Sequence, residues 1–353
     1  MKFLKDYALV FVSVLLFNLN VTASEDAHTE SKEEKFNPTE VILHHISDSH
    51  EWHIADWKNE NGEEVHLTIP LPVIVICEGQ FDVFLSSAFE HGHRDVIKGD
   101  KTYRLNHGHL EETSGASVLD FSITRNVASL FMSMLLLIWI FTASAKHYKS
   151  GIGAPKGIAS FMEPLILFVR DDIAIPNIGE KHYARFLPFL LTIFFFIWIN
   201  NLIGLVPFFP GGSNLTGNIA FTLVMSVITL IVTNVNANKD YWKHIFMPPV
   251  PVALWPIMIP VELIGVVSKP FALMIRLFAN ITAGHIIILS LVSLIFIFQT
   301  VWISPVSVAF VLFMNFIELL VAALQAYIFT LLTALFIGSG LVEHHHDHEE
   351  AHH

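Results

Sequence analysis

The stretch from about Val252 to Phe298 is far too hydrophobic to be a soluble helix, yet it contains an arginine, Arg276. A cation placed in hydrocarbon costs roughly 2.5–3.5 kcal/mol even on the lenient insertion scales. Such a charge occurs in an apolar helix when it faces protein or water and has a function there. The stretch therefore constrains the chain to a membrane fold in which Arg276 faces something other than lipid.

Composition supports a membrane protein with a soluble appendage. Of the 353 residues, 53% are hydrophobic and 15% are charged, whereas soluble domains have about 25% charged residues. The segment from Ser24 to Asp120 is polar and acidic, and long apolar runs extend from Val127 to Leu341. The net charge of −12 argues against a nucleic-acid partner. The one cysteine, Cys77, excludes an intrachain disulfide and a cysteine-based zinc site, and we expect it to be a small buried apolar residue.

The first residues, 1–23, are typical of a secretory signal peptide. Lys2 and Lys5 form a basic start, Tyr7 to Phe17 forms a short apolar core, and the small residues Val21-Thr22-Ala23 predict cleavage after Ala23. An uncleaved anchor helix is the alternative, but the apolar run falls short of the ~20 residues that span a bilayer. The signal predicts that the acidic segment, residues 24–120, lies outside the cytoplasm.

Within this acidic segment the pattern predicts a small β-containing domain. Glu25 to Asn37 is charged and is expected to be disordered. From Pro38 to about Tyr103, alternating stretches such as Val65 to Ile69 and Leu71 to Ile76 predict strands. The domain is rich in histidine, with no pair at a convincing metal-ligand spacing, so we expect solvated surface side chains rather than a metal site; they are His44, His45, His50, His53, His66, His91, His93, His107 and His109.

The membrane domain, residues 121–341, is predicted to be an all-α polytopic bundle of about five spans. They are expected at Asn126–Ala145, Ala184–Val206, Ile219–Asn234, Pro256–Phe298 and Pro305–Ile337. The last two exceed the ~20 residues of an upright span, so we expect a long, tilted helix hairpin. Ile158 to Val169 is apolar but short, which predicts an interfacial or re-entrant helix. The tail, residues 342–353, is rich in His and acidic residues, so a native cytoplasmic tail and a partial affinity tag are the two alternatives. We expect a native tail, because acidic residues and Ala351 interrupt the His run.

Loop charge predicts the orientation. Basic residues follow the first span (Lys146, Lys149, Lys156, Arg170, Lys181, Arg185) and the third span (Lys239, Lys243), whereas Pro207–Asn218 and Thr300–Ser304 contain no Lys or Arg. The amino-terminal domain is therefore expected outside and the carboxyl terminus inside, in agreement with the signal peptide.

Polar residues recur along the fourth span at helical spacings. Glu262, Lys269 and Arg276 are seven residues apart and share a face, with Asn280 one turn beyond Arg276. At ~1.5 Å per residue, His285 lies about 13 Å to the outer side of Arg276. It also lies nearly opposite Arg276 around the helix.

The fifth span carries Glu318 and Gln325 on one face, with Asn315 one turn before Glu318. We expect His285 to be the first partner of Glu318. Titratable groups on both sides of a fixed cation could form an ion path, because carboxylates and His exchange protons whereas Arg does not. The chain has no second central carboxylate to move past Arg276, so the pattern predicts a mobile anionic partner.

Three segments resemble the signatures of subunit a of F-type ATP synthases. They are Ser268-Lys269-Pro270, Arg276-Leu277-Phe278-Ala279-Asn280 and Leu324-Gln325-Ala326-Tyr327-Ile328-Phe329, within a match over roughly Asn126 to Leu341. The resemblance implies that Arg276 is the stator arginine facing the ring of c subunits, with Asn280 and Gln325 as polar neighbours. It assigns Glu262 to the cytoplasmic half-channel and His285 and Glu318 to the outer one. This His-then-Glu order is the reverse of that in many bacterial members and resembles the mitochondrial order.

The resemblance further implies a proton-translocating, non-catalytic subunit of a rotary motor in the bacterial inner membrane, with Lys269 among the residues near the path. Its implied partners are the c ring, peripheral-stalk b subunits, other ATP synthase subunits and lipid, and no cofactor or metal is implied. Two alternatives remain at this point: a self-contained secondary transporter, which should have an internal repeat that we do not find, and a non-conducting membrane anchor.

Overall fold

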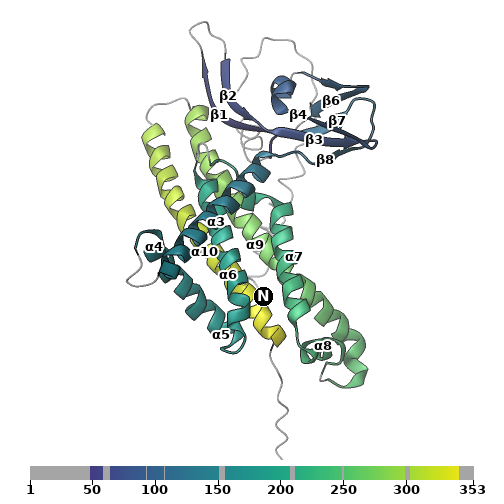
Figure 1. The fold of residues 1–353 in the computed structure, drawn as a ribbon, viewed down its shortest axis with the longest axis vertical. Coiled ribbons are helices and arrows are strands. Elements are labelled where there is room, and N and C mark those ends of the chain that lie inside the picture. The colour runs from purple at the N-terminus through teal and green to yellow at the C-terminus, as the bar shows by residue number, and fades with distance from the viewer. Residues whose placement is uncertain are drawn as a thin grey trace, which may run out of the picture. The chain divides into compact units, whose positions relative to one another are not determined.

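The computed structural model describes residues 48–58, 64–92, 94–106, 108–150, 156–206, 211–248, 250–298 and 303–341. Strands occupy the amino-terminal part of this range and helices the remainder (Figure 1). The predicted signal peptide, the Glu25–Asn37 segment and the carboxyl-terminal tail lie outside the described residues.

The amino-terminal part contains three small antiparallel sheets. The first pairs β1 (Glu51–Lys58) with β2 (Glu64–Pro70). The second has the order β4 (Gln80–Leu85), β3 (Pro72–Cys77) and β8 (Val118–Asp120). The third has the order β5 (Val96–Lys98), β6 (Lys101–Asn106) and β7 (His109–Glu112), and a 3-10 helix, η1 (Ser86–Gly92), precedes it. The two predicted strands are confirmed as β2 and β3.

Alternation along β3 determines the core of this region. Val73, Val75 and Cys77 are fully buried, and they pack with Phe84, Phe89 and Tyr103 among others. Cys77 is the small buried apolar residue that the sequence predicts.

The surface-histidine prediction is wrong for His50. Its side chain is 4% exposed, and its Nε2 atom lies 2.9 Å from Oδ2 of Asp120 at the end of β8. The acidic partner and the burial arise from a segment distant in sequence, so local composition gave no sign of them. His44, His45, His93 and His107 lie outside the described residues.

All five predicted spans are confirmed as helices long and apolar enough to cross a membrane. They are α3 (Arg125–Ser150), α6 (Tyr183–Leu205), α7 (Ile219–Asn236), α9 (Trp255–Phe298) and α10 (Ile303–Leu341). Asn218 begins α7 as an N-cap, because its side-chain oxygen accepts hydrogen bonds from the N–H groups of Ala220 and Phe221.

Shorter helices connect the spans. The predicted Ile158–Val169 helix is observed as α4 (Ile158–Phe168), which continues through a π-helical turn, η2 (Val169–Ala174), into α5 (Ile175–Ile178). Between α6 and α7 lies η3 (Leu215–Gly217), and before α9 lie α8 (Lys239–Phe246) and η4 (Val252–Leu254).

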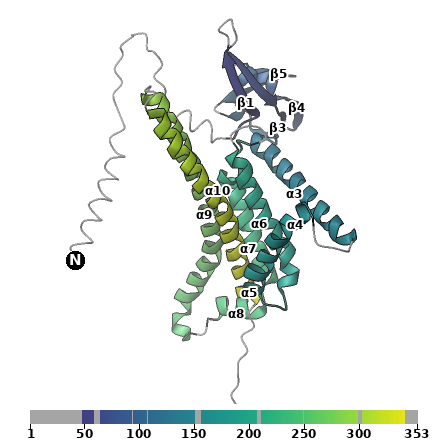
Figure 2. The same cartoon turned by 90° about the vertical axis from the view of Figure 1, so that its left-hand side faces the viewer.

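The helical core forms where α10 packs against both α6 and α9. Leu190 and Phe195 of α6, Leu273 and Leu277 of α9, and Phe329 of α10 are all buried in one cluster. Figures 1 and 2 show α9 and α10 adjacent at the hairpin end and separated near α8. The prediction of a long helix hairpin is therefore confirmed.

Candidate functional site

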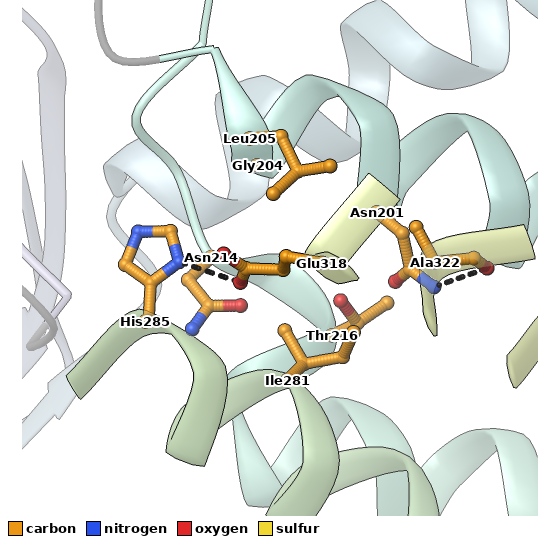
Figure 3. A pocket seen from close by; sticks show the side chains of 9 residues that line it. All are labelled: Asn201, Gly204, Leu205, Asn214, Thr216, Ile281, His285, Glu318 and Ala322. Carbon is orange, nitrogen blue, oxygen red and sulfur yellow. Dashed lines mark hydrogen bonds and ion pairs between the residues drawn. The ribbon is translucent and has the colours of Figure 1, made fainter. Parts of the chain in front are cut away.

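His285 of α9 and Glu318 of α10 face each other across the hairpin (Figure 3). The Nδ1 atom of His285 lies 3.6 Å from Oε1 of Glu318, and their side chains are 15% and 5% exposed. The structure thus brings together the two residues that the sequence predicts as partners. A carboxylate this deeply buried needs a polar partner, because an isolated buried charge is strongly unfavourable.

These two residues line a small pocket, which we call the His285 pocket. It has a volume of about 10 Å³, close to the minimum that holds one water molecule. Its lining is Asn201, Gly204, Leu205, Asn214, Thr216, Ile281, His285, Glu318 and Ala322. The Oε2 atom of Glu318 is buried without a hydrogen-bond partner in the described chain, so a water in this pocket could satisfy it.

Sequence reasoning missed the three other polar residues of this pocket: Asn201, Asn214 and Thr216. Asn201 of α6 donates from Nδ2 to the carbonyl of Ala322, 3.2 Å away on α10. Asn214 caps η3 by accepting from the N–H of Gly217 at 2.9 Å. Asn201 interrupts the second apolar span, and that interruption was the one signal available.

A second polar contact joins α9 and α10, at least one turn nearer to α8 than the His285–Glu318 pair. Asn280 donates from Nδ2 to Oε1 of Gln325 at 3.1 Å. Gln325 is 2% exposed, and its Nε2 atom has no partner in the described chain. This places the predicted neighbours of Arg276 in direct contact with each other.

Arg276 itself is exposed, although its helix is apolar. Within the described residues it makes no hydrogen bond or ion pair, and it lines none of the cavities described here. Ala272, Ala279 and Ala283, at helical spacings around it, are also exposed. Such a face allows another helix to approach closely.

Glu262 and Lys269 line a larger cavity, which we call the Lys269 cavity. Its volume is about 250 Å³, and its lining is Asp240, Tyr241, His244, Ile245, Glu262, Gly265, Val266, Lys269 and Ser339. It occupies the space between α8, α9 and α10. An adjoining cavity of about 10 Å³ shares Tyr241, Val266, Lys269 and Ser339 and extends to Thr229 and Thr233 of α7.

Three features make the Lys269 cavity polar. Burial, and then the charge of Glu262, raise the pKa of Tyr241, so its hydroxyl stays protonated and donates to Oδ1 of Asn234 at 3.3 Å. Pro270 has no N–H, which leaves the carbonyl of Val266 without its helical donor. Lys269 holds its ammonium 5.7 Å from the centre of the Phe336 ring, a cation–π distance.

The site therefore consists of two separate polar spaces on one helix pair, with Arg276 between them along α9. At ~1.5 Å per residue, Arg276 is about 10 Å from Lys269 and about 13 Å from His285 along the helix. This order along α9 is predicted from the sequence, whereas the α8 residues Asp240, Tyr241 and His244 are not.

Comparison with known proteins identifies this architecture. Residues 127–338 match the family described as ATP synthase A chain, which is more than half of the chain. The chain belongs to this family, the a subunits of F-type ATP synthases. Members are non-catalytic membrane subunits that work with other ATP synthase subunits.

Individual relatives of this family agree. ATP synthase subunit a of Chloroherpeton thalassium is 49% identical over 241 residues, covering 66% of this chain and 70% of that protein. ATP synthase subunit a of an Anaeromyxobacter species (strain Fw109-5) is 42% identical over 327 residues, covering 88% of this chain and 72% of that protein. The chain is thus a multi-pass membrane protein of the ATP synthase.

The strand region has a match of its own. Residues 41–127 match a domain of unknown function, DUF8433, which stops at the start of α3. Within the residues that the structure describes, no group of three or more His, Cys, Asp or Glu side chains could hold a metal ion.

Proposed function

We propose that this subunit forms two offset proton half-channels that load and unload carboxylates on a ring of c subunits. The observation that carries the proposal is the position of Arg276, exposed and unpaired in the described chain, between two polar cavities. A permanent cation there separates the cavities, because guanidinium does not release its proton at any accessible pH.

The His285 pocket is the outer half-channel in this proposal. A buried carboxylate and an imidazole 3.6 Å apart can pass a proton between them, directly or through one water. Asn201, Asn214 and Thr216 supply hydrogen-bonding groups without charge, so they can orient water without competing for the proton.

The Lys269 cavity is the cytoplasmic half-channel. Its volume of about 250 Å³ has room for several waters, and Glu262, Asp240 and His244 on its wall can accept a proton.

The exposed alanine face around Arg276 is where the c ring docks. A ring carboxylate is protonated through the outer half-channel and then moves away from Arg276 into the lipid. When the ring has turned, the carboxylate returns on the other side of Arg276 and releases its proton toward Glu262. Each charge that crosses the full membrane potential releases ~2.3 kcal/mol per 100 mV. Several protons must therefore cross for each ATP, and a rotating partner couples these crossings to one another. Peripheral-stalk b subunits would hold the subunit still.

Orientation follows from loop charge. The strand region and the amino terminus lie outside the bacterial inner membrane, and the carboxyl end of α10 lies in the cytoplasm, because the basic loops must face inward.

The decisive variant is Arg276→Ala in the intact complex, assayed for ATP-driven proton pumping in inverted membrane vesicles. We expect pumping to fall to background while a native gel shows normal assembly. Arg276→Lys keeps the charge but can release its proton, so vesicles with this variant should leak protons.

Arg170→Ala is the matched control, since Arg170 pairs only with its neighbour Asp171 in the described chain, 2.7 Å away. It should pump normally. Normal pumping by Arg276→Ala would contradict the half-channel proposal and favour a non-conducting anchor.

A further inference from the structure

The polypeptide just before β1 caps the first spanning helix. The Oδ1 atom of Asp48 accepts a hydrogen bond from the N–H of Asn126 at 3.1 Å, and the carbonyl of Ser49 accepts from the N–H of Arg125 at 2.8 Å. The first N–H groups of a helix lack partners within the helix. The strand region therefore completes α3 with a cap from a segment more than 70 residues earlier in the chain.

The same region holds the loop between α6 and α7. Trp52 of β1 is 5% exposed and donates from its indole Nε1 to the carbonyl of Gly211 at 3.3 Å. Ser213 donates from its hydroxyl to Oδ1 of Asn126 at 2.8 Å, and both side chains are buried. Gly211 itself packs so closely that a Cβ there would collide with Val206. The loop is thus fixed at two points two residues apart.

This loop leads directly into the His285 pocket. Asn214 and Thr216 line the pocket, and the next residue, Gly217, accepts a hydrogen bond from the hydroxyl of Thr282 at 3.4 Å. Thr282 lies one turn before His285 on α9. The backbone of residues 211–217 is therefore hydrogen-bonded to β1 at one end and to the pocket helix α9 at the other.

We propose that the strand region positions the outer half-channel, with Trp52 and Asp48 as positioning residues for proton transfer. Trp52 fixes Gly211, and Asp48 fixes Asn126, which fixes Ser213. Together they hold Asn214 and Thr216 beside Glu318. The strand region, which matches the domain of unknown function, would thus have a role that the membrane helices do not perform. This role rests on the proposed half-channel function.

The physical reason is the sensitivity of proton transfer to position. A proton moves between heavy atoms only within hydrogen-bond reach or through one well-placed water. The His285 pocket, at about 10 Å³, holds about one water, so a small movement of its wall removes the path. An α6–α7 loop without support would move on a much faster timescale than the helices.

The test uses Trp52→Phe in the intact complex, because phenylalanine keeps an aromatic ring and loses the indole N–H donor. Two quantities are measured: amide hydrogen exchange of residues 212–217, and the rate of ATP synthesis driven by a proton gradient. We expect exchange of the Gly217 amide to rise about five-fold and synthesis to fall about three-fold, the size of effect expected for one lost hydrogen bond.

Trp255→Phe is the matched control. Trp255 donates from Nε1 to the carbonyl of Val250 at 3.1 Å, so the variant removes the same type of bond at the opposite end of α9. It should leave exchange of residues 212–217 unchanged. Equal exchange in both variants would overturn the proposal.

Variants of Asp48 provide an independent test in case the complex with Trp52→Phe fails to assemble. Asp48→Asn retains the Oδ1 acceptor for the Asn126 amide, whereas Asp48→Ala removes it. We expect Asp48→Ala to loosen residues 212–217 and slow synthesis, and Asp48→Asn to restore both. Loosening without slower synthesis would overturn the positioning role.

Failure of the function itself would look different. If Arg276→Ala pumps normally, the half-channel proposal is wrong, whatever the exchange data show. If Arg276→Ala abolishes pumping while neither Trp52→Phe nor Asp48→Ala changes exchange, the function stands and the positioning role is wrong.

Discussion

Gly284 lies against Glu318 so closely that a Cβ atom added to the glycine would sit 3.0 Å from Oε1 of the carboxylate. Real Cβ atoms seldom come this close, so a side chain at Gly284 requires the Glu318 carboxylate to shift by a few tenths of an ångström. The glycine thus matters through the space it leaves beside the pair, and not through its backbone freedom.

Gly284→Ala should therefore slow proton pumping without preventing assembly. Alanine suits a helix better than glycine, so the helix itself gains stability. Displacing the carboxylate by an amount that costs ~1 kcal/mol would lower the rate about five-fold. Pumping in vesicles, normalised to the amount of assembled complex, measures the effect. Ser290→Ala is the control, because Ser290 is exposed on the same helix and lines none of the cavities described here. Equal slowing by both variants would argue against this account.

The His285–Glu318 pair should tolerate exchange of its two members. His285→Glu places two carboxylates together and Glu318→His places two imidazoles together, and either like pair loses the mutual stabilisation. The double variant restores one group of each kind. We expect each single variant to lose most of its pumping and the double variant to regain at least ten-fold over the better single one, equivalent to ~1.4 kcal/mol of coupling. Additive losses would show that the two residues act independently.

Removing the Asn280–Gln325 hydrogen bond should separate stability from function. Asn280→Leu leaves the buried amide of Gln325 without its partner, which costs ~1–3 kcal/mol, whereas replacing both residues by leucine is nearly neutral. The double variant should thus regain the thermal midpoint of the complex while its pumping stays low, because polar groups beside Arg276 are lost. Recovery of pumping in the double variant would reduce this pair to a packing contact.

The His50–Asp120 contact predicts an acid-sensitive strand region. Burial alone would raise the pKa of Asp120, but hydrogen bonds from His50 and Ser122 lower it to about 2. A carboxyl whose folded pKa lies below its unfolded value stabilises the fold fully above about pH 4 and loses this contribution as the pH falls toward 2. The contribution is about 1–2 kcal/mol after allowing for solvent screening.

Asp120→Asn should therefore lower the stability of the strand region at pH 7 and converge with the wild-type protein near pH 2. Proteolysis of the strand region in purified membranes, measured from pH 7 downward with an acid-tolerant protease, gives the comparison. Asp100→Asn is the control, because Asp100 lies in the exposed turn between β5 and β6. A constant difference between Asp120→Asn and wild type across this range would contradict the assignment.

The sequence by itself determined the positions of the five spans, the order of Glu262, Lys269, Arg276 and His285 along α9, and the pairing of His285 with Glu318. Length and apolarity mark a span because backbone groups in lipid must be satisfied within a helix. Helical spacing then places side chains on faces. The three signature segments identified the family on the same local evidence.

Only the tertiary structure decided which distant groups complete the cavities. Asn201 meets Ala322 across 121 residues, Trp52 meets Gly211 across 159, and His50 meets Asp120 across 70. Helical periodicity gives the face of a residue but not the neighbour that the face meets, since that depends on how each helix is rotated and packed. The exposure of Arg276 is of the same kind: the sequence called for a partner, and packing left this face of α9 uncovered.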